Sequence, residues 1–325
     1  MNSRPLRPIT EDDLEALQRD GVAFLPRMFD GDWIDRLRSA LDHIEHRQEQ
    51  LRQRMYRAPS AEIARQLYYT SNHMWISDPE LRAFVFESPA PLIARDIMGC
   101  QQTVGLFLDQ AFIQQAGDQP SPWHHGRAAF PLLGTQHLNM WIPLDAVSGD
   151  QGGLCFVKGS HRWDRYFLAA DHPLSARADR RFGEGGKYRY DDIPDIDPDD
   201  GTYECLTWSY RPGDVLVFGR NVLHCALGTA ETSIHRRALT TRWWGDDARF
   251  EYRPEQLGAL AYVSLRTGDP MDASPLFPRV LERAGDQWRR CAGDRIGAAR
   301  FLAQPLRPPA RSQPAPAQSG VAAAR

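Results

Sequence analysis

The pattern of apolar positions changes near residue 103. Before it, apolar side chains recur at helical spacing and form one stripe, made of Trp33, Ile34, Leu37, Leu41 and Ile44. Asp30 precedes this stripe, and Thr10 stands three residues before Asp13, so both are expected to cap helices. The charged residues 46–65 are expected to form a long solvated helix. This part of the chain therefore predicts helices, with a short strand at residues 22–25.

After residue 103, short apolar runs alternate with Gly, Pro and Asp turns. These runs predict strands at residues 103–107, 112–114, 137–144, 154–157, 215–218, 222–225 and 238–244. Short strands at such spacing are typical of a sandwich or barrel. Residues 173–202 are acidic, with Gly and Pro, and are expected to form a long loop.

The composition limits the classes of function. A chain of 325 residues with 42% hydrophobic content is expected to form one domain over residues 1–304, helical at about 8–100 and β-rich at about 103–250. The Pro- and Ala-rich residues 305–325 predict a disordered tail. A net charge of -3 and no apolar run of 18 residues give no reason to expect nucleic acid or a membrane. Five scattered cysteines favour reduced thiols and a cytoplasmic location.

The segment Ser121-Pro-Trp-His124-His125-Gly126 carries the candidate chemistry. Non-haem Fe(II) sites use two histidines and one carboxylate, and imidazole suits iron. His124 and the distant His224 are the candidate ligands. On a strand His125 would face away from the metal, whereas Gly126 returns to the face of His124 and has no side chain. The carboxylate position is therefore vacant.

Several ordered motifs resemble the phytanoyl-CoA dioxygenase-like family of Fe(II)/2-oxoglutarate oxygenases, over roughly residues 8 to 280. They lie at residues 20–26, 138–144, 152–161, 212–218, 221–224, 236–242 and 245–247. The resemblance implies a mainly β fold with flanking helices, a double-stranded β-helix of the jelly-roll or cupin-like type. It also implies Fe(II), 2-oxoglutarate and O2, and a small-molecule substrate.

The resemblance also assigns the co-substrate pocket. Arg236 matches the family's arginine, which binds the second carboxylate of the co-substrate, while Arg237 would face outward on a regular strand. Gln114 stands where many members carry lysine. Ala128 and Ala129 stand where many carry an aromatic residue, which implies a wider substrate pocket.

Strand alternation places further residues near the metal. Arg242 shares a face with Arg236, and Asn139 shares one with Trp141. The opposite face of that second strand holds Leu138, Met140 and Ile142, which are expected to pack in a core. Asn139 and Trp141 are thus candidates to line the metal cavity, Trp141 as part of the substrate pocket.

Three explanations of Gly126 stay open. Halogenases dependent on 2-oxoglutarate resemble this family with Gly or Ala in place of the carboxylate, and chloride would then bind iron beside Gly126, supported by Asn139 and Arg242. Alternatively, the protein is a hydroxylase whose coordination is completed by water or by another carboxylate, with Asp109 as the candidate. The third possibility is a non-catalytic or engineered metal-site variant that acts as a binding protein.

Overall fold

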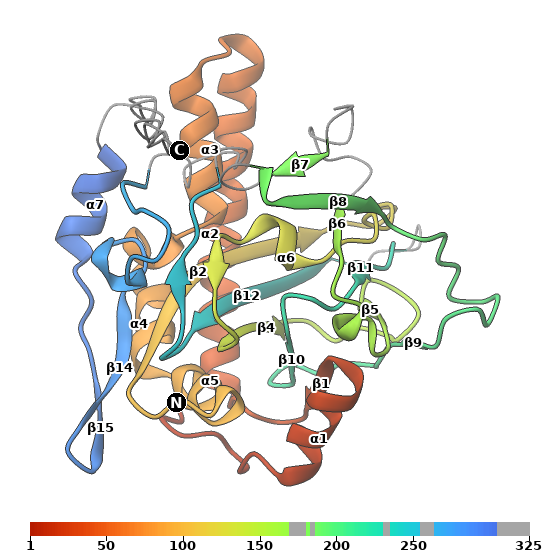
Figure 1. Ribbon diagram of the computed structural model, residues 1–325. Coiled ribbons are helices and arrows are strands. Elements are labelled where there is room, and N and C mark those ends of the chain that lie inside the picture. The colour runs from red at the N-terminus through yellow and green to blue at the C-terminus, as the bar shows by residue number, and fades with distance from the viewer. Residues whose placement is uncertain (169–179, 183–185, 230–234, 254–262, 304–325) are drawn as a thin grey trace, which may run out of the picture.

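The computed structural model describes residues 1–168, 180–182, 186–229, 235–253 and 263–303. Two facing antiparallel sheets form its centre, with helices on the outer face of the larger sheet (Figure 1). The larger sheet runs in the order β1 (Val22–Leu25), β10 (Val215–Phe218), β4 (His137–Pro143), β12 (Arg236–Trp244), β2 (Thr103–Gln114), β14 (Arg279–Ala284) and β15 (Gln287–Arg290). The smaller sheet runs β11 (His224–Ala226), β5 (Leu154–Val157) and β9 (Cys205–Leu206). A mainly β fold with flanking helices is confirmed.

The first helices begin at the predicted caps. Helix α1 (Glu11–Asp20) starts after Thr10, whose side chain forms a capping box with Asp13. Helix α2 (Gly31–Arg57) starts after Asp30, whose carboxylate accepts a hydrogen bond from the backbone N–H of Trp33. Its buried stripe includes the five apolar residues expected from the sequence.

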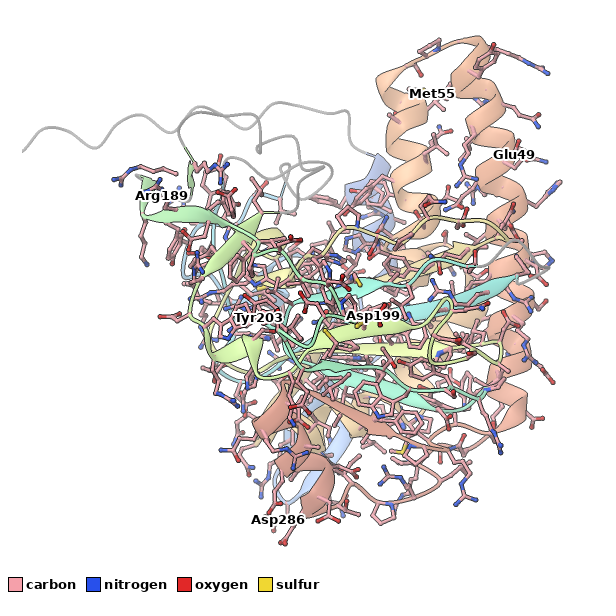
Figure 2. The ribbon with its side chains drawn as sticks, turned by 90° about the vertical axis from the view of Figure 1, so that its right-hand side faces the viewer. Glu49, Met55, Arg189, Asp199, Tyr203 and Asp286 are labelled. Atoms are coloured by element: carbon pink, nitrogen blue, oxygen red, sulfur yellow. The ribbon has the colours of Figure 1, made fainter. Side chains whose placement is uncertain are left out.

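The prediction of one helix over residues 46–65 is wrong. Helix α2 ends at Arg57, and α3 (Ala61–Ser71) begins after Ser60, which caps it. Pro59 lies between them and lacks the N–H that a continuous helix would need. In Figure 2, Glu49 and Met55 mark the end of α2 that projects past the sheets.

The remaining helices complete the outer layer. They are α4 (Pro79–Glu87), α5 (Ala90–Met98), α7 (Arg295–Ala303) and the short helices η1 (Met74–Ile76) and η5 (Met271–Ala273). The short helix η2 (Ser160–Arg162) instead follows β5 of the smaller sheet and bonds to α1 and to Leu223. Among the described residues, none of the helices has the length and apolar character needed to cross a membrane.

Alternation along the strands of the larger sheet separates two cores. Leu138, Met140 and Ile142 of β4 pack with the helices, as expected. Trp141, on the other face of β4, packs with Phe156, Phe218 and other residues between the two sheets. The inner face of the larger sheet is therefore the face that is available to a site between the sheets.

Short elements surround the open end of this interior. They are α6 (Gly126–Ala129), the pair β3 (Leu132–Leu133) and β13 (Arg249–Phe250), and the strands β6 (Tyr166–Leu168), β8 (Tyr188–Asp192) and β7 (Arg181–Phe182). The last two strands lie within residues 173–202, so the prediction of a loop throughout that segment is wrong. The expected tail, residues 305–325, lies outside the described residues.

Candidate metal centre

His124 and His224 lie side by side although they are far apart in the sequence. They form an isolated antiparallel bridge, and their backbones exchange two hydrogen bonds of 2.9 Å. The centroids of the two imidazole rings are 4.4 Å apart. A metal with bonds to nitrogen of roughly 2 Å, as for zinc, fits between rings at this separation. The structure thus brings together the two candidate ligands.

The backbone fixes the tautomer of both rings. Nδ1 of His124 lies 2.8 Å from the carbonyl oxygen of Pro122, and Nδ1 of His224 lies 3.0 Å from that of Val222. A carbonyl only accepts hydrogen bonds, so each Nδ1 carries a proton, and Nε2 is the atom through which each neutral ring can bind a metal.

His224 is held in its neutral form. Burial, and then the charge of His124, lower its pKa well below the ordinary value. The rings of Phe156 and Phe218 lie against it, with centroids 5.6 Å and 4.9 Å away. Because metals bind neutral imidazole, this apolar setting favours a ligand role.

His125 does not join the pair. Its Nε2 accepts a hydrogen bond of 2.8 Å from the backbone N–H of Phe167, and its Nδ1 lies 3.4 Å from the carbonyl oxygen of Asn221. Burial lowers its pKa to about 4. His125 is a buried structural residue that faces away from His124.

An aromatic ring takes up the space beside Gly126. A Cβ built on Gly126 would lie 2.7 Å and 2.8 Å from Cε2 and Cδ2 of Phe130, and 3.4 Å from Cβ of Arg220. Real Cβ atoms do not approach carbon so closely. Any side chain at position 126 therefore requires the Phe130 ring to move.

No other carboxylate replaces it in the part of the chain that the structure describes. There, no group of three His, Cys, Asp or Glu residues is placed to hold a metal. Asp109 lies opposite Thr241 on β2, facing the helices, and its Oδ2 accepts a hydrogen bond of 2.8 Å from the backbone N–H of Trp75. Burial raises its pKa to about 7. The hypothesis that Asp109 completes the coordination is wrong, because β2 holds it on the opposite face of the sheet.

Arg236 lies inside, between the two sheets. It is 2% exposed, and it pairs in register with Gln114 of β2, whose Oε1 accepts from its Nη2. Its guanidinium carbon is 5.6 Å from the ring centroid of Trp141. Nε and Nη1 are buried without a hydrogen-bond partner. These two N–H groups are suited to a carboxylate that enters from outside the chain.

Arg237 lies on the other face of β12. Its guanidinium donates to both carboxylate oxygens of Asp145, at 3.0 Å and 2.8 Å, and to Asp42 at 2.6 Å. These side-chain hydrogen bonds are the main reason that its pKa is raised. The structure thus places Arg236 inward and Arg237 outward, in the predicted register.

Asn139 and Arg242 are direct neighbours across β4 and β12. The Nδ2 of Asn139 donates to the carbonyl of Phe218 at 3.3 Å. The guanidinium carbon of Arg242 is 4.7 Å from the ring centroid of Phe130. Burial lowers the pKa of Arg242 to about 10. Both residues line a small hollow that also includes Phe130.

Sequence reasoning missed Phe130, Arg220 and His137, which also line this hollow. The family resemblance places an aromatic residue at positions 128 and 129. In the structure the aromatic ring comes from Phe130, directly after α6. Its position two residues before the start of β3 was the available signal. The structure places Ala128 in α6 and describes nothing of its side chain.

Residues 17–238 match the profile of a known family, phytanoyl-CoA dioxygenase (PhyH). The chain belongs to the phytanoyl-CoA dioxygenase family. Its members are Fe(II)/2-oxoglutarate-dependent oxygenases, so this member of the family is an oxidoreductase. No curated protein sequence matches the chain.

Solved structures confirm the jelly-roll fold of this phytanoyl-CoA dioxygenase family member. The carbocyclase SnoK from nogalamycin biosynthesis, described as non-heme and alpha-ketoglutarate-dependent, has 17% identity and a TM-score of 0.59, covering 86% of this chain and 99% of its own. The epimerase SnoN, solved with Fe3+, alpha-ketoglutarate and nogalamycin RO, has 17% identity and a TM-score of 0.54, covering 86% and 96%. EctD from S. alaskensis, solved with 2-oxoglutarate and 5-hydroxyectoine, has 16% identity and a TM-score of 0.55, covering 83% and 92%.

Proposed function

We propose that this protein is a non-haem Fe(II)/2-oxoglutarate-dependent halogenase that acts on an unactivated C–H bond of a small molecule. One observation carries the proposal. The two adjacent histidines are not joined by a third His, Cys, Asp or Glu that could hold a metal among the described residues, and Gly126, which we take as the third ligand position, has no side chain. A two-histidine site keeps one more positive charge than a site with a carboxylate, and that charge favours a small anion.

The roles of the chain's own residues follow from their geometry. Nε2 of His124 and Nε2 of His224 would hold the iron, since both Nδ1 atoms are engaged by carbonyls. Nε and Nη1 of Arg236 would bind the distal carboxylate of 2-oxoglutarate, with Gln114 fixing the guanidinium. Bound iron and 2-oxoglutarate, with O2, supply the oxidation of the substrate C–H bond. Trp141 packs against Arg236 and helps to exclude water from this pocket.

Phe130 would control the chloride position. The edge of an aromatic ring is electropositive, and ring-edge carbons face the point where a side chain at Gly126 would begin. This edge favours an anion, but the ring must turn to make room for one. The positive charge of Arg242, in the adjoining hollow, would favour the anion from a distance without contacting it.

Hydroxylation is the second candidate, and the same ring favours it. The Phe130 ring lies against the Cβ position of Gly126, next to the proposed chloride position. If the ring stays there, water completes the coordination and the product gains an oxygen atom. The two candidates therefore differ in one measurable property, which is whether chloride enters the metal site.

The test is an anaerobic chloride titration of the Fe(II)/2-oxoglutarate protein, followed by its absorption spectrum and, once the substrate is known, by product mass under O2. We expect a saturable chloride-dependent change and a chlorine isotope pattern in the product. No chloride effect, with a product heavier by one oxygen, would establish the hydroxylase instead.

Gly126→Asp alone is a poor test because its Cβ meets the Phe130 ring at 2.7 Å. The matched set is Phe130→Ala, which opens the position, and Gly126→Asp/Phe130→Ala, which fills it with a carboxylate. We expect the single variant to bind chloride and the double variant to bind iron without chloride. Chloride binding by the double variant would contradict the proposed position.

A further inference from the structure

A small hollow lies against the inner face of the larger sheet. We call it the arginine hollow, and its polar lining consists of His137, Asn139, Arg220 and Arg242. Phe130 forms one of its apolar walls, together with residues of β2, β4 and β12. The hollow therefore joins the sheet to the segment that carries Gly126.

The hollow contains two guanidinium groups and no carboxylate in its lining. Nε and Nη1 of Arg242, and Nε of Arg220, are buried with no hydrogen-bond partner. The other nitrogens of Arg220 donate to the carbonyls of Leu132 and Gly134, which are neutral acceptors. Desolvation lowers the pKa of each of these arginines to about 10. Neither arginine forms an ion pair with a described carboxylate, and buried charged N–H groups without an acceptor are costly, so an anion is expected there.

Two other arginines in the described part of the chain do form ion pairs with a carboxylate. Arg253 lies 2.5 Å from Glu251, and Arg237 lies 2.8 Å from Asp145. Asp109 is the carboxylate whose charge acts on Arg242, but it lies on the opposite face of β2 and forms no ion pair with it. The charge on Arg242 is left for a partner from outside the chain.

This partner is not the co-substrate that we assign to Arg236. Arg236 and Arg242 are six residues apart on β12, which is about 20 Å along an extended strand. Their guanidinium groups lie against different partners, that of Arg236 against Trp141 and Gln114 and that of Arg242 against Phe130. The arginine hollow is therefore a separate anion site.

The hollow is close to the metal histidines. The Phe130 ring contacts both the Cβ position of Gly126 and the guanidinium of Arg242. Gly126 in turn follows His124 by two residues. A molecule anchored in the hollow would thus extend from Arg242 past Phe130 toward the two histidines.

We infer that the arginine hollow anchors an anionic substrate by its carboxylate or phosphate group, with Arg242 as the principal binding residue. This inference rests on the proposed function, because it supplies the substrate class for that site. Arginine suits either group, since its planar N–H pair matches two oxygens at once. Asn139 would orient the anchored group, and the apolar walls would exclude water from it.

The test uses the anaerobic Fe(II) protein saturated with 2-oxoglutarate, at constant chloride. Acetate and methyl phosphate are the probes for the two kinds of anion, and calorimetry measures their affinities. We expect one probe to bind and Arg242→Gln to weaken it more than 10-fold, with Arg242→Lys between the two. Arg237→Gln, on the other face of the same strand, should bind the probe as the wild type does.

If the probes bind too weakly for calorimetry, the change in Tm on adding the probe provides a second measurement. Without a probe, Arg242→Gln should be as stable as the wild type or more stable, since it removes an uncompensated buried charge. The probe should raise the wild-type Tm and leave that of Arg242→Gln unchanged. Equal probe-induced shifts in both proteins would overturn the inference.

Three other outcomes would also overturn it. Displacement of 2-oxoglutarate by the probe would make the hollow part of the co-substrate site. Competition between chloride and the probe, lost in Arg242→Gln, would make it the halide site. No binding of either probe to a folded wild type would leave Arg242 without a ligand role. Failure of the proposed function is separate, because it would appear first as loss of iron or 2-oxoglutarate binding in the starting protein.

Discussion

Arg236 and Arg237 are neighbours on β12, yet they lie in opposite environments. Arg237 faces the helices and is matched by Asp145 and Asp42. Arg236 faces the interior between the sheets, where Gln114 is its neutral partner and two of its N–H groups have none. The hydrogen-bonding groups of Arg237 are paired within the folded chain, whereas those of Arg236 need a ligand to pair fully. The residue type is the same, so the face of the strand decides the role.

The two neighbouring histidines show the same division. His125 is hydrogen-bonded to the backbone at both ring nitrogens. His124 instead pairs with His224, and we propose its Nε2 as a metal ligand. In both pairs, one residue is held by hydrogen bonds within the folded chain, and its neighbour is the one that we propose to bind a ligand.

The largest expected difference is in Fe(II) affinity, between the variants His124→Ala and His125→Ala. Removing His124 should weaken Fe(II) binding by more than about 100-fold, because loss of even an outer-shell partner costs 10–100-fold. Removing His125 should leave iron affinity nearly unchanged and destabilise the fold by about 1–3 kcal/mol, since the N–H of Phe167 loses its acceptor. Equilibrium dialysis with iron and urea unfolding measure the two effects. Equal iron affinities of the two variants would contradict the assignment of His124 as a metal ligand and His125 as a structural residue.

A second prediction concerns pH and the helix-facing side of β2. The pKa of Asp109 is raised to about 7 by burial, whereas it is about 3.9 in an unfolded chain. Between these values the native state binds the extra proton, so Asp109 makes the fold less stable as pH rises from about 4 to about 7.

Asp109→Asn should remove this loss, which amounts to at most about 4 kcal/mol. The measurement is the unfolding free energy of both proteins across that pH range, because their difference cancels the other titrating groups. Iron binding should stay intact, since Asp109 lies away from the histidines. If the two stability curves run parallel, Asp109 does not titrate in this range.

The smallest expected effect is the change in stability caused by replacing Arg237. Arg237→Gln should lower the unfolding free energy by about 1–3 kcal/mol, because Asp145 keeps its burial but loses a charged partner. Asp145→Asn/Arg237→Gln should recover part of the loss. A thermal melt measures both, and an unchanged Tm in Arg237→Gln would show that these ion pairs contribute nothing to stability.

The sequence predicted the elements that follow a regular period. The residues that form β5 and β10 were predicted with their observed bounds, and two-residue alternation placed Arg236 and Arg237 on their faces. His124 and His224 were predicted as a pair because their motifs resemble a known family. In each case the information is local or lies in a motif.

The rest depends on packing between segments. Phe130 fills the space at Gly126 because its ring is held by Phe107 and Arg242, which come from two different strands. Arg220 reaches the hollow through hydrogen bonds to carbonyls near β3. No spacing rule connects these positions. The strands β7 and β8 were missed because the acidic composition of the segment outweighed a weak strand pattern.

Calorimetric titration of 2-oxoglutarate into the anaerobic Fe(II) protein tests the central claim most directly, namely that the inner face of β12 binds ligands and the outer face does not. Arg236→Ala should weaken binding by about 10- to 100-fold, the effect of losing a charge-assisted contact. Arg237→Ala, the matched control, should bind 2-oxoglutarate as the wild type does. The opposite result, with tight binding in Arg236→Ala and weak binding in Arg237→Ala, would contradict the account.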